Sequence, residues 1–240
     1  MRYICTAVVA MLVLAGTSFA ATINVPGDHA TIQGAIDASS DGDVIAIAAG
    51  TYYESDLNSG GKAITIGSAS GNLDVTIDAQ QGGSVFVIES GEGVNTVIQN
   101  LVITGGLGFS NHGGGITCSY NSSPTITNCT IMGNKSQYRG GGITCSYNCN
   151  PAISNCTIEG NTSFSQGGGI YLTGSSPTIT DCTLLGNIAV ADFNGDDYGG
   201  GIYCVDNCSP TISGCTITGN TADYGGGIYC NNSSSPTITD

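Results

Sequence analysis

The chain has 240 residues, of which 38 are Gly, 11 are Cys and none is Trp, and its formal net charge is -14. Gly does not recur at every third position, which excludes a collagen helix, and 40% hydrophobic residues are enough for a core, which excludes wholesale disorder. Four basic residues against 18 acidic ones exclude nucleic acid and anionic membranes as partners. Cations, neutral or cationic polymers and other proteins remain.

Residues 1–20 have the pattern of a secretory signal peptide. A positive start at Arg2 is followed by an apolar run to Gly16 and by small residues at Ser18 and Ala20. This order predicts cleavage after Ala20 and a protein that is secreted or displayed on the outer cell surface. The apolar run is shorter than the roughly 20 residues of a spanning helix, so we expect no transmembrane span in the mature chain.

Residues 21–112 form an N-terminal region without regular repeats. Residues 31–39 place their apolar side chains on one face of a short helix, with Asp28 or Thr31 as the N-cap. Such a helix is expected to cap the open edge of the sheets that follow. Short apolar runs predict strands at residues 44–48, 63–66, 75–77 and 85–88.

Residues 113–240 repeat a unit of 26 or 27 residues, with one copy of 32. Gly-Gly-Gly-Ile begins each copy, at positions 113, 140, 167, 199 and 225, and is followed by Pro-(Thr/Ala)-Ile, Cys-Thr-(Ile/Leu) and Gly-Asn. Each unit holds three short segments in which apolar and polar residues alternate, the period of a β-strand. Such strands bury their apolar face only by stacking copy on copy, about 4.8 Å apart. The sequence therefore predicts an all-β fold, a right-handed parallel β-helix with a short N-terminal capping helix.

Stacking predicts ladders of identical side chains inside the helix. Residues 97–106 align with residues 125–134, so Leu101 takes the position of Cys129. The last copy stops within a unit at residues 236–240, which predicts further coils or a polar cap beyond it. The ladder residues are Cys118, Cys129, Cys156, Cys182, Cys215 and Cys230, and Asn134, Asn161, Asn187 and Asn220.

Two parts of the sequence resemble known β-helix proteins. Residues 31–38 (TIQGAIDA), Gly42-Asp43 and residues 50–54 (GTYYE) resemble the capping segment of the pectin lyase-like superfamily. The Gly-Gly-Gly-Ile copies resemble the Gly-Gly-Ala-Ile element of chlamydial polymorphic outer-membrane proteins and of secreted bacterial β-helix repeat proteins. The resemblance covers roughly residues 22–240 and implies the fold, but the superfamily includes lyases, hydrolases, esterases and adhesins.

The sequence offers little for catalysis. A lyase resembling the pectate lyases would need Ca²⁺-binding Asp residues and a cationic base, and a hydrolase would need an acidic pair in a cleft. Beyond residue 20 the basic residues are only Lys62, Lys135 and Arg139, and His29 and His112 have the setting of turn residues. We assign no catalytic residue.

The favoured function is therefore a secreted or cell-surface scaffold without catalysis. Its partners would be a polysaccharide, or proteins of a host or cell surface as for an adhesin. The alternative is a polysaccharide-active enzyme, either a lyase or a glycoside hydrolase. A third hypothesis is ice binding by outward Thr ladders, although Thr is also a common outward residue in strands. These ladders comprise Thr125 and Thr127, Thr178 and Thr180, Thr211 and Ser213, and Thr237 and Thr239.

The long copy carries an acidic loop at residues 192–197. Oxygen-bearing side chains alternate there around Gly195, as in the first half of a Ca²⁺-binding loop, but the distal Glu of such a loop is missing. The loop is either a weak Ca²⁺ site or an acidic surface insertion, and no other cofactor is expected. The candidate ligands are Asp192, Asn194, Asp196 and Asp197.

Ten cysteines remain after removal of the signal peptide, in a chain bound for an oxidising compartment. Cys149 and Cys208 occupy a position where other copies carry Ser, and they lie two copies apart, which is too far for a mutual bond. Each follows another Cys by four residues, so we predict disulfides between Cys145 and Cys149 and between Cys204 and Cys208. The alternatives are bonds along the ladder, joining Cys118 to Cys145 and Cys204 to Cys230, or a stack of buried thiols.

Overall fold

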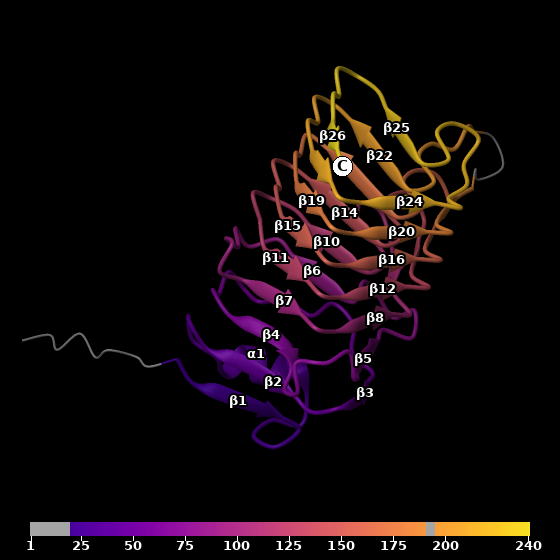
Figure 1. Ribbon diagram of the computed structural model, residues 1–240. Helices are drawn as coiled ribbons and strands as arrows, with labels where there is room; N and C mark the ends of the chain where they lie inside the picture. The colour runs from indigo at the N-terminus through magenta and orange to yellow at the C-terminus, as the bar shows by residue number, and fades with distance from the viewer. Residues whose placement is uncertain (1–19, 191–194) are drawn as a thin grey trace, which may run out of the picture.

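The computed structural model describes residues 20–190 and 195–240, which wind into a parallel β-helix (Figure 1). Every pairing of neighbouring strands is parallel, and the strands align into four sheets that run along the helix axis. The predicted signal peptide at residues 1–20 lies almost wholly outside the described residues and stays a prediction.

Each sheet collects one strand per coil. The nine-stranded sheet contains β1 (Thr22–Val25), β2 (Val44–Ile47), β4 (Thr65–Ser68), β7 (Val97–Gln99), β11 (Thr125–Thr127), β15 (Ala152–Ser154), β19 (Thr178–Thr180), β23 (Thr211–Ser213) and β26 (Thr237–Thr239). The seven-stranded sheet contains β3 (Gly50–Tyr52), β5 (Val75–Asp78), β8 (Val102–Thr104), β12 (Thr130–Met132), β16 (Thr157–Glu159), β20 (Thr183–Leu185) and β24 (Thr216–Thr218).

Two smaller sheets complete each regular coil. The four-stranded sheet contains β9 (Leu107–Gly108), β13 (Lys135–Ser136), β17 (Thr162–Ser163) and β21 (Ile188–Ala189). The six-stranded sheet contains β6 (Phe86–Ile88), β10 (Ile116–Cys118), β14 (Ile143–Ser146), β18 (Ile170–Thr173), β22 (Ile202–Val205) and β25 (Ile228–Cys230). The regular copies thus have four strands and not the three that we predicted, because strands of two residues are too short to show a period.

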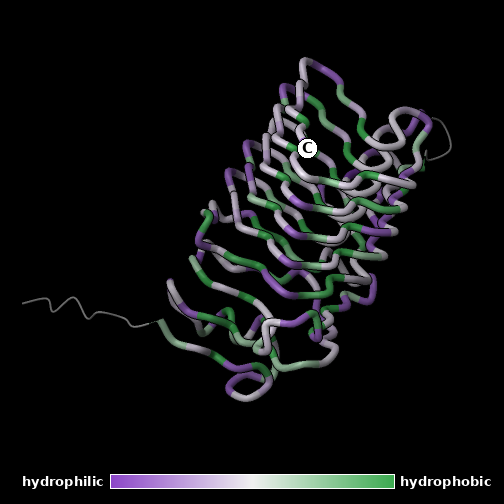
Figure 2. Tube along the Cα trace, in the orientation of Figure 1, coloured by the Kyte–Doolittle hydropathy of each residue, from purple (hydrophilic) through white to green (hydrophobic). Residues whose placement is uncertain are grey.

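Apolar side chains from successive coils stack inside the helix. In β11 the central Ile126 is buried, whereas Thr125 and Thr127 are partly exposed. Ile126 lies in register with Ile98 of the preceding coil and with Ile153 of the next. Figure 2 shows hydrophobic and hydrophilic positions recurring from coil to coil. Burial therefore fixes the register, because a slip of one residue would turn each Ile outward.

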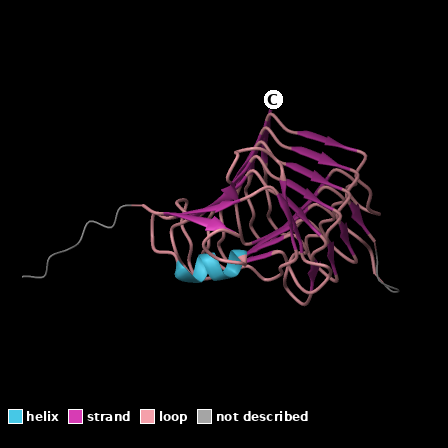
Figure 3. Ribbon diagram, turned by 90° about the horizontal axis from the view of Figure 1, so that it is seen from below, coloured by secondary structure: helices cyan, strands magenta, loops and turns pink. Residues whose placement is uncertain are grey.

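The predicted N-terminal helix is α1 (Ile32–Ala38), which packs against β1 and β2 (Figure 3). Of the two N-cap candidates, Thr31 has this role, since its Oγ1 accepts a hydrogen bond from the Gly34 N–H at 3.1 Å. At the other end the Lys62 Nζ donates to the Ile36 carbonyl at 2.6 Å and to the Asp37 carbonyl at 2.9 Å. Helix capping therefore uses one of the few cations of the chain.

The Gly triplets run between the four-stranded and six-stranded sheets, where backbone segments of adjacent coils come very close. A Cβ added to Gly141, the middle residue of one triplet, would lie 2.5 Å from the Gly168 carbonyl oxygen of the next coil. Gly142 has the same relation to the Gly169 oxygen at 2.7 Å. Only Gly fits at these positions, which explains the recurrence of the triplet.

Candidate functional site

The predicted Asn ladder lies inside the helix and binds one coil to the next. The Asn161 Oδ1 accepts from both the backbone N–H and the Nδ2 of Asn134, at 3.0 and 3.1 Å. The Asn161 Nδ2 in turn donates to the Ile131 carbonyl and to the Asn187 Oδ1. Asn134, Asn161 and Asn187 are fully buried, and Asn220 continues the chain of bonds. These amides leave no polar group free for a ligand, so the ladder is structural.

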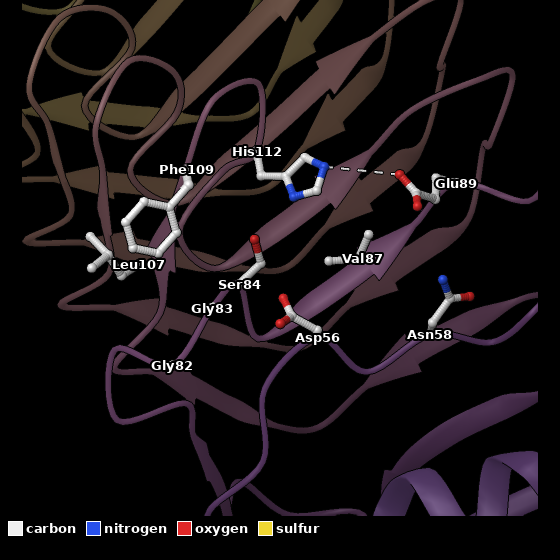
Figure 4. Close-up of a pocket in the computed structure, with 10 residues that line it drawn as sticks. All are labelled: Asp56, Asn58, Gly82, Gly83, Ser84, Val87, Glu89, Leu107, Phe109 and His112. Atoms are coloured by element: carbon white, nitrogen blue, oxygen red, sulfur yellow. Dashed lines mark ion pairs between the residues drawn. The ribbon is translucent and has the colours of Figure 1, made fainter.

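A pocket on the irregular coils brings together two carboxylates and an imidazole (Figure 4). Its volume is about 360 Å³. Asp56 and Glu89 come from adjacent coils, because the neighbouring residue Leu57 pairs with Phe86 of β6. His112 closes the pocket, with its Nε2 4.0 Å from the Glu89 Oε2. The other lining residues are Asn58, Gly82, Gly83, Ser84, Val87, Leu107 and Phe109.

The sequence did not predict this pocket. It placed acidic clustering only in the loop at residues 192–197 and treated His112 as a turn residue, whereas the His112 side chain is 41% exposed and faces Glu89. The first coils carry no repeated sequence motif. The strand register that places Asp56 beside the start of β6 therefore cannot be derived from residue spacing. Asp56 has φ 54, and its carboxylate packs against Gly83.

Two exposed tyrosines form a flat aromatic surface beside β10 and β14. The rings of Tyr120 and Tyr147 have centroids 5.2 Å apart and are parallel to within 2°. The residues are 57% and 50% exposed, with φ values of 54 and 56. A bulky residue rarely adopts this left-handed conformation. The signal for the pair was present in the sequence as the repeated Cys-Ser-Tyr-Asn at residues 118–121 and 145–148.

A second pocket, of about 300 Å³, adjoins this tyrosine pair. It is lined by Arg139, Tyr147, Thr173, Gly174 and Asp206. Both pockets lie along the six-stranded sheet, because Val87 of β6 lines the first and Thr173 of β18 lines the second. One register column of this sheet runs through Val87, Thr117, Thr144, Tyr171, Tyr203 and Tyr229, and the first five of these residues are buried.

The comparison with protein families agrees with this architecture. The model of a family described as right handed beta helix region matches residues 57–240. The chain belongs to this family. Neither a curated protein nor a solved structure matches it. The β-helix is thus right-handed, as we expected, while its resemblance to the pectin lyase-like superfamily and to chlamydial proteins stays a prediction. Among the residues that the structure describes, no helix has the length and apolar character needed to cross a membrane.

Eight of the ten cysteines after residue 20 form two columns in the right-handed β-helix. Cys129, Cys156, Cys182 and Cys215 each precede a strand of the seven-stranded sheet, in register. Hydrogen bonding with the Cys129 thiol, together with burial, raises the pKa of Cys156 to about 12. Hydrogen bonding with the Cys156 thiol and burial likewise raise the pKa of Cys182. The thiols of Cys156 and Cys182 therefore stay protonated near neutral pH.

The second column places Cys118 in register with Cys145, and Cys204 in register with Cys230. In contrast, the Cys149 Sγ accepts a hydrogen bond from the Ser122 N–H of the preceding coil, at 3.2 Å. The Cys208 Sγ accepts in the same way from the Ser175 N–H at 3.4 Å. Cys149 and Cys208 thus accept a backbone hydrogen bond at the position where other copies carry Ser, as Ser175 does from the Cys149 N–H. All ten cysteines after residue 20 are free thiols in the structure, so the disulfide connectivity stays a prediction.

The register now favours the ladder alternative for the oxidised protein. Paired residues of adjacent parallel strands lie about 4.8 Å apart, within the range for a disulfide. We expect non-reducing peptide mapping to show Cys118 joined to Cys145 and Cys204 joined to Cys230, with Cys149 and Cys208 alkylated. Bonds from Cys145 to Cys149 and from Cys204 to Cys208 would instead support the local pairing predicted from the sequence.

The predicted Ca²⁺ loop lies only partly within the described residues, since Asp192 and Asn194 fall outside them. Asp196 accepts from the Tyr198 hydroxyl at 3.2 Å, and the nearly buried Asp197 accepts from the Asp223 N–H at 3.1 Å. Hydrogen bonding with the Asp197 carboxylate, and its charge, raise the pKa of Asp223. Within residues 20–190 and 195–240, no group of three or more His, Cys, Asp or Glu side chains is placed to hold a metal.

Ca²⁺ binding at this loop stays a prediction. We expect isothermal titration to detect weak, millimolar binding that is lost in Asp192→Ala and in Asp196→Ala, because both remove oxygen ligands. Asp41→Ala, at an exposed carboxylate remote in sequence from the loop, is the matched control. If wild type gives no heat above baseline at millimolar Ca²⁺, the loop is an acidic surface insertion.

The outward Thr residues lie on the nine-stranded sheet. Thr125, Thr178, Thr211 and Thr237 share one register column, and Ala152 interrupts it. Thr178 and Thr211 are exposed, whereas Thr125 is partly buried. The ladders expected from the sequence are therefore present, and ice binding stays an untested hypothesis for them.

Proposed function

We propose that the protein is an exported β-helix scaffold that binds a polysaccharide through exposed aromatic side chains beside the six-stranded sheet. The stacked pair of Tyr120 and Tyr147 carries this proposal. Aromatic rings that are exposed, flat and fixed in orientation match the apolar faces of sugar rings, and each Tyr hydroxyl adds a polar contact at the edge. The export pattern at residues 1–20 supports a place outside the cell.

Backbone strain supports a binding role for these tyrosines. Non-Gly residues in the left-handed region cost of order 1–3 kcal/mol each and cluster at functional sites. Two consecutive coils hold Tyr in this conformation, at φ 54 and 56, although Gly174 occupies the equivalent position one coil further on. Keeping a strained Tyr where Gly fits is consistent with a use for the ring.

The net charge of -14 fits a polymer that is uncharged or nearly so. A strongly anionic protein repels dense polyanions at long range, and this repulsion weakens as salt screens it. The other candidate partners are proteins of a host or cell surface, as for an adhesin. A binding array that carries both glycans and proteins separates the two classes.

Substitution of the tyrosine pair tests the proposal. In a glycan-array and affinity-electrophoresis experiment, Tyr120→Asn and Tyr147→Asn should each weaken binding at least tenfold, because the stacking surface is lost. Asn accepts the left-handed conformation, so the fold is retained. Tyr53→Asn is the matched control, since Tyr53 is 63% exposed and lies near β3. Unchanged binding in both tyrosine variants would contradict the proposal.

A second candidate function is hydrolysis of a polysaccharide, favoured by the pocket of Asp56, Glu89 and His112. Glycosidases use two carboxylates on either side of the scissile bond, one as acid and one as base or nucleophile. Release of new reducing ends by wild type, abolished in Asp56→Asn and in Glu89→Gln but not in Asp41→Asn, would establish an enzyme. Binding without product release would support the scaffold.

A further inference from the structure

Arg139, one of the few cations of this chain, packs its guanidinium against a buried tyrosine ring. Its backbone N–H donates to the Ser136 Oγ at 3.1 Å, which fixes the turn between β13 and the Gly triplet. Its guanidinium carbon lies 5.1 Å from the centroid of the Tyr171 ring. Tyr171 is 5% exposed and forms a rigid base for the cation.

The guanidinium is partly buried, and no carboxylate of the described residues lies within ion-pair distance of it. The Arg139 Nη1 is buried and has no hydrogen-bond partner among the described residues. Among the described residues the one ion pair joins His112 to Glu89, so Asp206, which also lines the pocket, lies beyond ion-pair distance of Arg139. Burying part of a charged group without a partner is unfavourable, and the contact with Tyr171 offsets only part of this cost.

The pocket beside Arg139 exists because one coil carries Gly where its neighbours carry side chains. Gly174 stands in register between Tyr147 and Asp206, and a Cβ there would meet only the Asp206 carbonyl oxygen at 4.0 Å. Asp206 is held in place by the Thr173 hydroxyl at 3.2 Å and by the Asn232 Nδ2 at 3.0 Å. The lining of the pocket thus includes a cation, an acceptor and an aromatic ring.

We propose that this pocket binds the carboxylate of an acidic sugar that occurs singly in an otherwise uncharged glycan chain. This inference rests on the proposed function and names the kind of polymer. The guanidinium would bind the carboxylate, since its planar fork matches that group, while Asp206 accepts from sugar hydroxyls and Tyr147 stacks on the ring. A densely charged polyanion is disfavoured, because the protein carries -14 and the pocket supplies one positive charge.

The test compares ligands that differ only in the carboxylate. Wild type is titrated by NMR with glucose, glucuronate and methyl glucuronate, and by affinity electrophoresis with neutral xylan, sparsely substituted glucuronoxylan and polygalacturonate. We expect glucuronate to bind at least tenfold more tightly than glucose or the methyl ester, and glucuronoxylan more tightly than the other two polymers. Added salt should reduce the difference in affinity between glucuronoxylan and polygalacturonate, because salt screens the long-range repulsion between the protein and the polyanion.

Three variants assign the preference to this pocket. Arg139→Gln should reduce the ratio of glucuronate to glucose affinity to about one, since the anion loses its partner. Gly174→Asn keeps Arg139 and tolerates the left-handed backbone but fills the pocket, so it should remove the preference as well. Lys135→Gln removes the same charge from an exposed site on β13 and should leave the ratio unchanged.

Two results would overturn the inference: equal binding of glucuronate and glucose by wild type, or a preference that survives in Arg139→Gln. Equal binding of neutral xylan and glucuronoxylan, both weakened by Tyr147→Asn, would refute the acidic pocket and leave polysaccharide binding intact. Glucuronate binding that depends on Arg139, without any binding of neutral xylan, would support the pocket and contradict the aromatic site of the proposed function.

Discussion

Asn161→Ala should lower the free energy of unfolding by about 3 kcal/mol, because it leaves several buried polar groups without partners. The Asn161 side chain is fully buried and joins three coils. Its removal leaves the Asn134 N–H and the Ile131 carbonyl without the bonds they make in wild type, at 3.0 and 2.9 Å. Urea unfolding followed by circular dichroism gives the change directly.

Two further variants separate the hydrogen bonds from simple loss of volume. Asn95→Ala removes the same groups from an exposed position and should change stability by less than about 0.5 kcal/mol. Asn161→Asp keeps the size but replaces the donor with a charge facing the Ile131 carbonyl and the Asn187 Oδ1. Burial raises the pKa of the introduced carboxyl, so its destabilisation should be largest at high pH and shrink as pH falls. An Asn161→Ala protein as stable as wild type would show that the ladder contributes nothing.

Much of the fold could be predicted because identical residues recur at fixed intervals. The position of Ile126 relative to Ile153 follows from counting between the Gly triplets, and strand pairing in the structure has that register. The same counting placed Leu101 level with Cys129, and Leu101 is fully buried. A solenoid allows this inference because each strand pairs with its own copy, so a local period determines long-range contacts.

The candidate sites were harder to predict because they lie where the repetition is broken. Glu89 and Asp56 meet on irregular coils, and no landmark in the sequence gives their register. Arg139 and Gly174 depart from the residues at equivalent positions in neighbouring copies. Strand positions that recur in every copy hold structural residues, whereas a ligand pocket depends on departures from the repeat. In such proteins the exceptions to the repeat are the better guide to function.

Glu92→Gln should destabilise the protein by about 2–4 kcal/mol at neutral pH, since it replaces a buried carboxylate that accepts four hydrogen bonds. One oxygen, Oε1, accepts from the Ser59 hydroxyl at 2.7 Å and from the Gly61 N–H at 3.0 Å. The other, Oε2, accepts from the Ser90 N–H and the Ser122 hydroxyl, both at 2.8 Å. Glu92 is 1% exposed. An amide nitrogen in place of either oxygen would face donors and leave them unsatisfied.

The effect should depend on pH with a defined sign. Burial by itself raises the pKa of Glu92, but the hydrogen bonds from Ser59, Ser122 and the backbone outweigh it, so the pKa lies below its ordinary value. A carboxyl with a lowered folded pKa stabilises the protein fully above its unfolded pKa of about 4.3 and loses this contribution as pH falls through the folded pKa. The stability difference between wild type and Glu92→Gln should therefore be constant from neutral pH to about pH 5 and shrink below about pH 4.

Urea unfolding of both proteins at several pH values measures this difference. Asp28, Asp43 and Asp74 also have lowered pKa values, because backbone or hydroxyl groups donate to them, but their titration is common to both proteins and cancels. Glu159→Gln, which removes the same charge from a partly exposed site on β16, should show neither the large loss nor the pH dependence. A difference that stays constant down to pH 3 would mean that hydrogen bonds to the Glu92 carboxylate do not stabilise its charged form, and that its burial reflects packing alone.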